Sequence, residues 1–139
     1  MNATPDDWRP LRAGGFMDHI GPLCAQRGAE GWRYALTTGP EHANTVGLVH
    51  GGVIAALLDH ALSLVAWEAA GRVPLVTVQL DTRYLQAARP GARLEATARV
   101  RHATRSLMFM DAELCADGRE IATAFAVMKL SVPHGGKDA

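Results

Sequence analysis

Residues 52–70 constrain the fold most, because this stretch is apolar on nearly every side. Its large apolar residues do not share one narrow helical stripe; they are Val53, Ile54, Leu57, Leu58, Leu62, Leu64, Val65 and Trp67. A helix that is hydrophobic all round belongs in the interior of a protein. Gly71 follows directly and favours a helix end there. The sequence therefore predicts one long buried helix near the middle of the chain.

Strand-like segments lie on both sides of this helix. Residues 32–36 predict a first strand, which the Gly39-Pro40 breaker ends. Four more strands are predicted after the helix, at residues 75–85, 94–101, 107–115 and 120–132. In the first of these, Val76, Val78, Leu80 and Tyr84 alternate with Thr77, Gln79, Asp81 and Arg83. Asp117-Gly118 is typical of a type I′ hairpin turn. We expect the four strands to form an antiparallel meander, in an α+β fold whose sheet wraps around the helix.

The chain length suits one domain over residues 1–139, because 139 residues can bury a single core. Residues 1–13 are polar and contain prolines, so we expect a flexible arm. Residues 16–24 carry apolar residues at helical spacing and predict a short covering helix. Residues 133–139 are expected to form a polar tail.

Composition excludes several classes of function. With 14 basic and 14 acidic residues the formal net charge is zero, which argues against a general affinity for nucleic acid or anionic membranes. The first thirteen residues lack the apolar stretch of a signal peptide, and no segment has about 18 consecutive apolar residues. We therefore expect a cytoplasmic protein. Cys24 and Cys115 are expected to be free thiols, and the six histidines match no metal-binding pattern, so no metal or cofactor is expected.

Asp59 interrupts the apolar helix and is the first candidate for chemistry. No Lys or Arg occurs between Ala43 and Gly71, so the acid has no local cation to pair with. A carboxylate in apolar surroundings is costly unless hydrogen bonds or a catalytic task justify it. The alternative is a structural acid that caps a loop or binds water in the core.

A set of motifs around Asp59 resembles one enzyme family, the hotdog-fold thioesterases of the phenylacetate-degradation type. The motifs are Asn44, His50-Gly51-Gly52, Asp59, Thr77 in the following strand, Tyr84-Leu85 and Pro90-Gly91. The resemblance covers roughly residues 30–131. It implies a five-stranded antiparallel sheet around a central helix, dimers usually paired into homotetramers, and hydrolysis of acyl-CoA thioesters at sites formed between subunits. Gln86 departs from the pattern, because a basic or small residue often follows the Tyr-Leu pair.

Gly51 and Gly52 lie where the helix begins. A thioester carbonyl under attack develops negative charge on oxygen, and the unpaired amides at a helix start suit that charge. We assign the oxyanion contact to the Gly51 amide, and we include Gly52 among the substrate-binding residues because glycine lets a substrate approach the backbone closely. The alternative is a glycine pair that only permits a tight turn into the helix.

Asp59 lies eight positions after Gly51 on the same predicted helix. At 1.5 Å per residue about 12 Å separates them, so one chain cannot bring both groups to one carbonyl. If both act on one substrate, a second copy of the chain must place its Asp59 beside this Gly51. The spacing therefore gives a reason for the homodimer with shared active sites that the resemblance implies.

The remaining site residues surround these two groups. Asp59 has two possible roles, nucleophile or general base for water, and either Thr77 or Ser63 is expected to orient it or the water. We prefer Thr77, because its spacing after Asp59 resembles that of the phenylacetate-type branch. Ser63 can instead bond back to the Asp59 carbonyl, as a mid-helix serine often does. Asn44 is expected to donate to the thioester or leaving group and His50 to hold the loop, although both also suit purely structural loop roles.

The arginines of residues 89–105 are candidates for binding the CoA phosphates. They are Arg89, Arg93, Arg99, Arg101 and Arg105, and a solvated strand face explains most of them equally well. Arg105, at a turn, is our first choice.

Two other functions compete with the acyl-CoA thioesterase. A hotdog hydratase or dehydratase acting on acyl thioesters needs an acid and a base across the substrate, and the Asp-x-Asn-x-x-His type of hydratase motif is missing. A non-catalytic acyl-CoA binding module would keep the Gly51 loop and lose the acid, so the presence of Asp59 argues against it.

Overall fold

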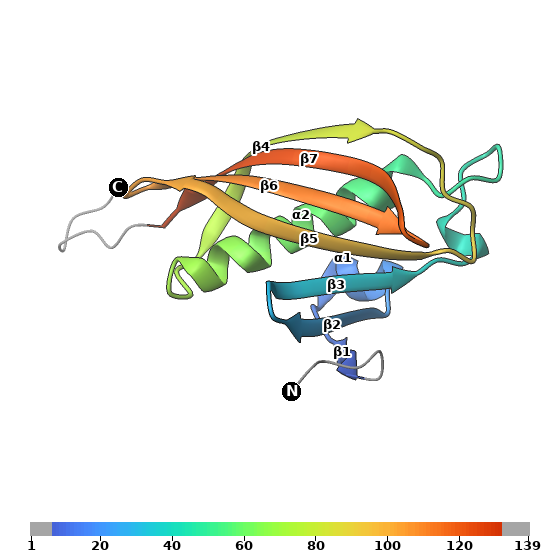
Figure 1. The fold of residues 1–139 in the computed structure, drawn as a ribbon, viewed down its shortest axis with the longest axis horizontal. Helices are drawn as coiled ribbons and strands as arrows, with labels where there is room; N and C mark the ends of the chain where they lie inside the picture. Colours follow the sequence, from blue (N-terminus) through green and yellow to red (C-terminus); the bar gives the residue numbers. More distant parts are fainter. Residues whose placement is uncertain (1–6, 132–139) are drawn as a thin grey trace.

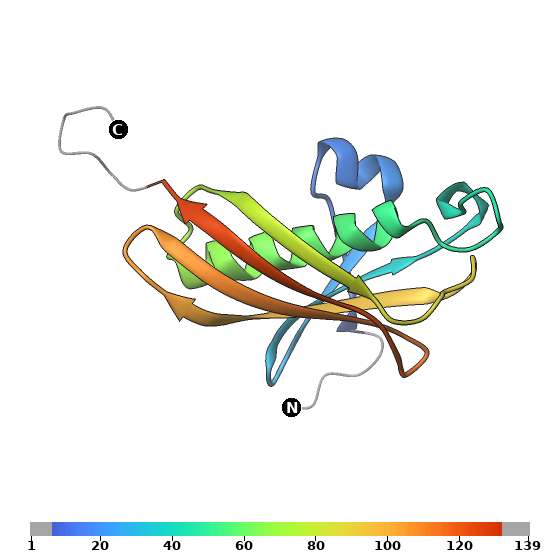
Figure 2. The same ribbon diagram turned by 90° about the horizontal axis from the view of Figure 1, so that it is seen from above.

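A computed structural model describes residues 7–131. Its elements are β1 (Arg9–Leu11), α1 (Gly15–Ile20), β2 (Leu23–Gly28), β3 (Gly31–Thr37), a short 3-10 helix (Pro40–His42), α2 (Gly51–Ala69), β4 (Leu75–Tyr84), β5 (Arg93–Ala103), β6 (Leu107–Ala116) and β7 (Arg119–Leu130). The strands form one antiparallel sheet in the order β1-β2-β3-β5-β6-β7-β4. Figures 1 and 2 show this sheet curving around α2, which lies across one face of it. The prediction of a long central helix within a wrapped antiparallel sheet is confirmed.

The helix α2 buries one face and not its whole circumference. The buried residues are Ile54, Leu57, Leu58, Ala61, Leu62 and Ala66. They belong to the same core as the fully buried Leu94, Met110, Leu114, Ile121 and Met128 of the sheet. Other apolar positions, including Val53, Leu64 and Val65, are only partly buried, so the prediction of burial all round is wrong for a single chain. By length and composition α2 is the one helix of the described segment that could span a membrane, a test that core helices also pass.

The strand order differs from the predicted four-strand meander. β5, β6 and β7 do pair consecutively, and Asp117 (φ 51°) and Gly118 (φ 75°) form the predicted turn between the last two. β4, however, pairs with β7 instead of β5. β3 already occupies the free side of β5, so β4 takes the outer edge beyond β7. The connecting residues 85–92 therefore carry the chain from the edge of the sheet back to its middle.

The sheet has seven strands instead of five, because two strands form where other structures were expected. α1 ends at Ile20, since Gly21-Pro22 follows and a residue before proline disfavours helical backbone. The chain then enters β2 at Leu23, so the expected helix over residues 16–24 is too long. Within the expected arm, Arg9–Leu11 pairs with β2. Residues 1–6, and the tail expected at 133–139, lie outside the described residues.

A β-bulge between Thr77 and Gln79 breaks the alternation predicted for β4. Val76 and Val78 are 61% and 56% exposed, whereas Thr77 and Leu80 are partly buried. An extra residue shifts the side-chain phase of a strand by one position. The bulge therefore puts Thr77 on the same side as Leu80, although the sequence alternates them.

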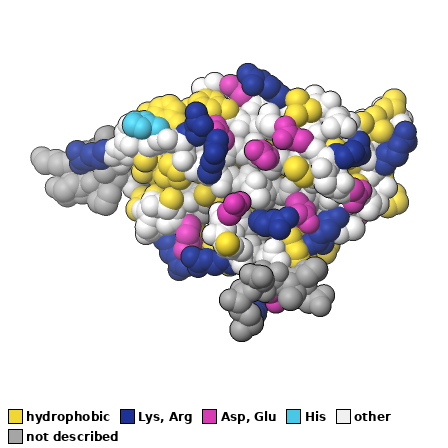
Figure 3. All heavy atoms as spheres, viewed as in Figure 1, with side chains coloured by type: hydrophobic (Ala, Val, Ile, Leu, Met, Phe, Trp, Pro, Cys, Tyr) yellow, Lys and Arg dark blue, Asp and Glu magenta, His cyan; other side chains and the backbone are white. Residues whose placement is uncertain are grey.

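The outer face of the sheet carries interleaved charges of both signs (Figure 3). Arg99 and Arg101 lie 3.6 and 3.2 Å from Asp111 on the neighbouring strand, and Glu95 pairs with Arg33 and Arg93. The alternative of a solvated strand face therefore explains the three arginines of β5.

Candidate active site

The carboxylate of Asp59 is held by a hydroxyl and not by a cation. The hydroxyl of Thr77 donates to Asp59 Oδ1 at 2.8 Å, and its Oγ1 lies 3.3 Å from the sulfur of Met128. Both Asp59 and Thr77 are partly buried. Among residues 7–131, no Lys, Arg or His forms an ion pair with Asp59. The contact joins the middle of α2 to β4, and it depends on the bulge that turns Thr77 toward the helix.

Ser63, the other hydroxyl considered for this role, makes no side-chain hydrogen bond within the described part of the chain. The bond back to the Asp59 carbonyl that a mid-helix serine can form is therefore absent there. In a single chain Thr77, and not Ser63, contacts the carboxylate.

The amides at the start of α2 are all occupied except one. His50 N–H donates to the His42 carbonyl at 2.8 Å, and Gly52 N–H donates to His50 Nδ1 at 2.7 Å. Val53 N–H and Ile54 N–H both donate to the His50 carbonyl, at 2.9 and 3.3 Å. The Gly51 amide has no acceptor among residues 7–131.

The direction of the Gly51 amide follows from the same bonds. In a trans peptide the C=O and N–H groups point in opposite directions. The His50 carbonyl points along α2 toward Val53 and Ile54, so the Gly51 N–H of the same peptide points away from the helix. Of the five amides from His50 to Ile54, only Gly51 offers a donor to an external acceptor.

His50 is the N-cap residue of α2. Because its Nδ1 accepts the Gly52 amide, the ring proton of the neutral form lies on Nε2. A Cβ at Gly52 would lie 3.0 Å from this nitrogen, so the cap uses the close approach that glycine allows. The structure places His50 in the predicted loop-holding position. It also occupies the Gly52 amide, which is therefore unable to donate to a substrate in this conformation.

Asn44 closes the loop that leads to the helix. Its side-chain oxygen accepts hydrogen bonds from the backbone N–H groups of Val46 and Leu48, both at 3.0 Å. The backbone N–H of Asn44 donates to the Leu48 carbonyl at 2.7 Å. The oxygen thus serves a turn. Its side-chain nitrogen has no hydrogen-bond partner within residues 7–131 and remains the group that a ligand could contact.

Two residues of this region escaped the sequence reasoning. His42 is 2% exposed; its Nδ1 accepts from Gly39 N–H at 2.9 Å and its Nε2 donates to the Ile20 carbonyl at 2.6 Å. Tyr84 entered only as part of a motif, yet its hydroxyl donates to the Gly51 carbonyl at 2.8 Å. The bonds of His42 to Ile20 and of Tyr84 to Gly51 follow from no local pattern, because they span 22 and 33 positions of sequence.

His60 follows Asp59 but faces different surroundings. Its Nε2 is buried and has no hydrogen-bond partner within residues 7–131, and its ring meets that of Tyr34 edge-on at a centroid distance of 6.4 Å. Burial lowers the pKa of His60, while the Asp59 charge acts in the opposite direction. Adjacent residues of a helix point about 100° apart, so the His60 ring and the Asp59 carboxylate face different sides of α2.

Asp59 and Gly51 lie on one unbroken helix, eight residues apart. The axial distance between them is therefore about 12 Å. The structure thus keeps the acid and the free amide of one chain separate, as the spacing predicts.

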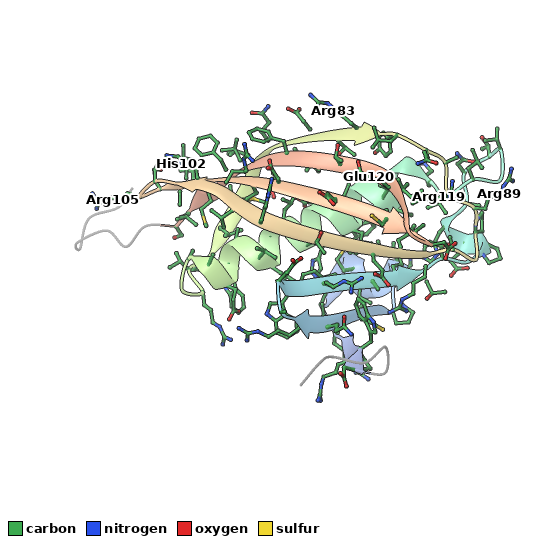
Figure 4. All side chains as sticks on the ribbon, in the orientation of Figure 1. Arg83, Arg89, His102, Arg105, Arg119 and Glu120 are labelled. Carbon is green, nitrogen blue, oxygen red and sulfur yellow. The ribbon has the colours of Figure 1, made fainter. Side chains whose placement is uncertain are left out.

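Two of the five candidate phosphate-binding arginines, Arg89 and Arg105, lie at opposite ends of the sheet. Figure 4 shows Arg89 and Arg119 at one end and Arg105 at the other. The end with Arg89 adjoins the helix start, because Val49 N–H donates to the Ala88 carbonyl at 2.8 Å. Within one chain Arg105 is therefore remote from Gly51. In the described segment, no group of three or more His, Cys, Asp or Glu residues is placed to hold a metal ion.

Comparison with known proteins places this arrangement in a family. Residues 46–123 match the model of the thioesterase superfamily. A predicted esterase of Pseudomonas aeruginosa is 32% identical over 94% of this chain and 99% of its own length.

Solved structures share the fold. A variant of the phenylacetic acid degradation protein PaaI from Thermus thermophilus has a TM-score of 0.73 and 25% identity, covering 84% of this chain and 98% of its own. A Bacillus halodurans protein solved with CoA has a TM-score of 0.67 and 24% identity, covering 70% of each chain. The chain therefore belongs to the thioesterase superfamily and is a thioester hydrolase of the hotdog fold.

Proposed function

We propose that the protein hydrolyses acyl-CoA thioesters at sites that combine Gly51 of one protomer with Asp59 of another. The observation that carries the proposal is the pair of groups on α2: a helix-start amide that finds no acceptor among residues 7–131, and a partly buried carboxylate held by Thr77. The CoA bound to the Bacillus halodurans structure supports the choice of CoA thioesters.

The chemistry follows from these two groups. The Gly51 N–H donates to the thioester oxygen as it gains negative charge, aided by the positive end of the helix dipole. Asp59 either deprotonates the attacking water or attacks the carbonyl carbon itself. In the first case water adds, the C–S bond breaks and the thiolate of CoA takes up the proton. In the second case the C–S bond breaks to leave a mixed anhydride, which water then hydrolyses.

The homodimer forms, in this proposal, along β4. This strand is an edge of the sheet, and its exposed Val76 and Val78 suit burial against a second copy. The partly buried side of α2, which carries Asp59 and Ser63, lies in the same region, since Thr77 of β4 contacts Asp59. A second copy would therefore cover apolar surface and bring its own Gly51 toward this Asp59.

A homotetramer would pair two such dimers through the outer faces of their sheets. That face carries both positive and negative side chains, so two copies of it can pair opposite charges. Phe125 lies among these charges and is 38% exposed, which adds apolar surface for the contact. We also propose a cytoplasmic location, which the two unpaired cysteines favour because reduced thiols persist there.

The phosphates of CoA are proposed to bind Arg89 and Arg119 in preference to Arg105. Both arginines line a cavity of about 680 Å³ that Leu48, Gln86 and Asp117 also border. Arg119 donates to the Gln86 side chain at 3.1 Å, and Gln86 donates to the Glu120 carbonyl at 3.0 Å. Gln86, which departs from the family pattern, thus holds an arginine of the neighbouring hairpin.

Paired substrates test the phosphate site. Arg89→Gln and Arg119→Gln should each raise KM for an acyl-CoA by about tenfold, the worth of a charged hydrogen bond. KM for the matching acyl-pantetheine, which lacks the nucleotide, should stay unchanged, and Lys129→Gln on the outer face serves as control. A rise in KM for Arg105→Gln alone would move the phosphate site to the other end of the sheet.

Gly51→Pro tests the oxyanion donor directly. Proline has no N–H, is favoured at the first helical position, and suits the extended backbone of the preceding His50 (φ −62°, ψ 133°). We expect kcat to fall roughly 10²- to 10³-fold in thiol-release assays over a panel of acyl-CoAs. Gly51→Ala, which adds a Cβ and keeps the amide, is the matched control. Equal rates for the two variants would refute the donor role.

Mixing two inactive variants tests the shared site. A heterodimer of Asp59→Ala and Gly51→Pro chains contains one site in which both groups are native, so activity should return when the chains are co-expressed. Sites contained within one chain would stay inactive. Hydration of an enoyl-CoA without thiol release would instead support the hydratase alternative, and binding without turnover would support the binding module.

A further inference from the structure

Tyr84 is an exposed residue whose hydroxyl nevertheless bonds to the protein backbone and not only to water. Its side chain is 53% exposed at the end of β4, yet its hydroxyl donates to the Gly51 carbonyl at 2.8 Å. The ring also covers Gly51, because a Cβ built there would lie 3.3 Å from two ring carbons and from the hydroxyl oxygen of Tyr84. The side chain of Tyr84 therefore contacts the backbone at the start of α2, although water alone could satisfy its hydroxyl.

The peptide that joins Gly51 to Gly52 is consequently bonded at both ends. Tyr84 binds its carbonyl, and His50 Nδ1 accepts its N–H at 2.7 Å. The preceding peptide is held by its own carbonyl, which accepts from Val53 and Ile54. With the planes on either side of Gly51 fixed, the direction of the Gly51 N–H is fixed as well.

This restraint matters because the segment is intrinsically flexible. Two consecutive glycines lose more backbone entropy on ordering than any other pair, and first turns of helices fray. A donor stabilises a developing charge efficiently only if it is already oriented when the charge forms.

The backbone around Tyr84 is itself held in place. Leu85 N–H and Gln86 N–H both donate to the Ile121 carbonyl, at 2.8 and 3.2 Å. Two positions further on, the Ala88 carbonyl accepts from Val49 N–H at 2.8 Å. Tyr84 therefore reaches Gly51 from a segment bonded both to β7 and to the loop before α2.

We infer that Tyr84 is a positioning residue that orients the Gly51 amide for the thioester oxyanion, an inference that rests on the function proposed above. The strand β4 of one chain then serves two different sites: Thr77 near its start holds the Asp59 of one site, and Tyr84 at its end holds the Gly51 of the other.

Tyr84→Phe tests the inference, because it removes the hydroxyl and keeps the ring. We expect kcat to fall about tenfold while KM for the acyl-CoA stays within twofold, since the lost bond orients a donor without touching the substrate. Amide exchange measured by NMR should quicken at Gly52, where the restrained peptide is released. Tyr34→Phe, a change at a buried tyrosine outside the site, is the control and should leave kcat unchanged.

The outcomes separate the two claims. If Gly51→Pro is inactive while Tyr84→Phe keeps full kcat and unchanged Gly52 exchange, the positioning role is refuted and the oxyanion role survives. If Gly51→Pro keeps full kcat, the oxyanion role fails first. A Tyr84→Phe variant that loses kcat but shows unchanged Gly52 exchange would also refute positioning, because the hydroxyl would then act by another route.

Discussion

Replacing Thr77 by valine removes one hydroxyl and leaves the shape of the side chain nearly unchanged. In the native protein that hydroxyl donates to Asp59 Oδ1 at 2.8 Å. Valine is β-branched like threonine, so it keeps the strand preference of β4 and most of its packing. The variant therefore isolates the hydrogen bond between β4 and α2.

The expected loss of stability follows from the charge and burial of the pair. A hydrogen bond to a charged group contributes about 1.5–3 kcal/mol. Because Asp59 and Thr77 are only partly buried, water can replace part of the bond, which favours the lower end, about 1.5 kcal/mol. For a domain of 139 residues this corresponds to a fall in Tm of about 6 °C.

The rate of catalysis should fall as well, because without the Thr77 hydroxyl the Asp59 carboxylate can rotate away from its productive direction. We expect kcat for thiol release to fall at least about tenfold. Thr97→Val is the matched control, because it makes the same chemical change at an exposed strand position on the outer face of the sheet. The Thr97 hydroxyl makes no side-chain hydrogen bond within the described residues, so this variant should change neither Tm nor kcat. If thermal unfolding and kcat of the two valine variants agree within error, the Asp59–Thr77 contact has no role in either property.

Three further predictions concern the helix and the interface. His50→Ala should lower the free energy of unfolding by about 0.5–2 kcal/mol in urea titrations, because the Gly52 amide loses its cap, whereas His50→Asn should recover most of it. Burial lowers the pKa of His60, so the folded protein resists its protonation and should lose stability as the pH falls below the pKa of the unfolded state, about 6.5. Between about pH 7.5 and 5.5, the Tm of His60→Phe should therefore fall less than the Tm of the native protein. An equal fall in Tm for both proteins would show that His60 is not the group responsible. Val78→Glu should dissociate the proposed dimer in sizing experiments, since it places a charge on the exposed edge of β4; an unshifted elution volume would exclude this edge as the interface.

The predicted and observed folds agree where local patterns carry the information. The long helix, the strand over residues 31–37 and the Asp117-Gly118 hairpin each follow from the spacing of apolar residues or from turn chemistry. β2 was hidden because its apolar residues continue the helical spacing of α1, and only Gly21-Pro22 separates the two elements. Because the residue before a proline disfavours helical backbone, Pro22 is the local feature that indicates the end of the helix.

The candidate site shows the same division. Asp59 stands out because an acid in an apolar helix is unusual, and Gly51 stands out because it begins that helix. Tyr84 could not be singled out, since its contact with Gly51 spans 33 positions of sequence. Alternation alone groups Thr77 with the polar face of its strand, and the bulge that reverses this leaves no mark in the sequence.

The sequence by itself determined the elements of this protein and the groups able to do its chemistry, because helical and strand periodicity, turn residues and an unpaired acid are properties of neighbouring residues. Only the tertiary structure decided that β4 lies at the edge beside β7, that Thr77 faces Asp59, and that the Gly51 amide of the helix start has no acceptor in the described part of the chain. Each of these depends on hydrogen bonds between segments far apart in the chain, and such bonds form only when the sheet closes around the helix.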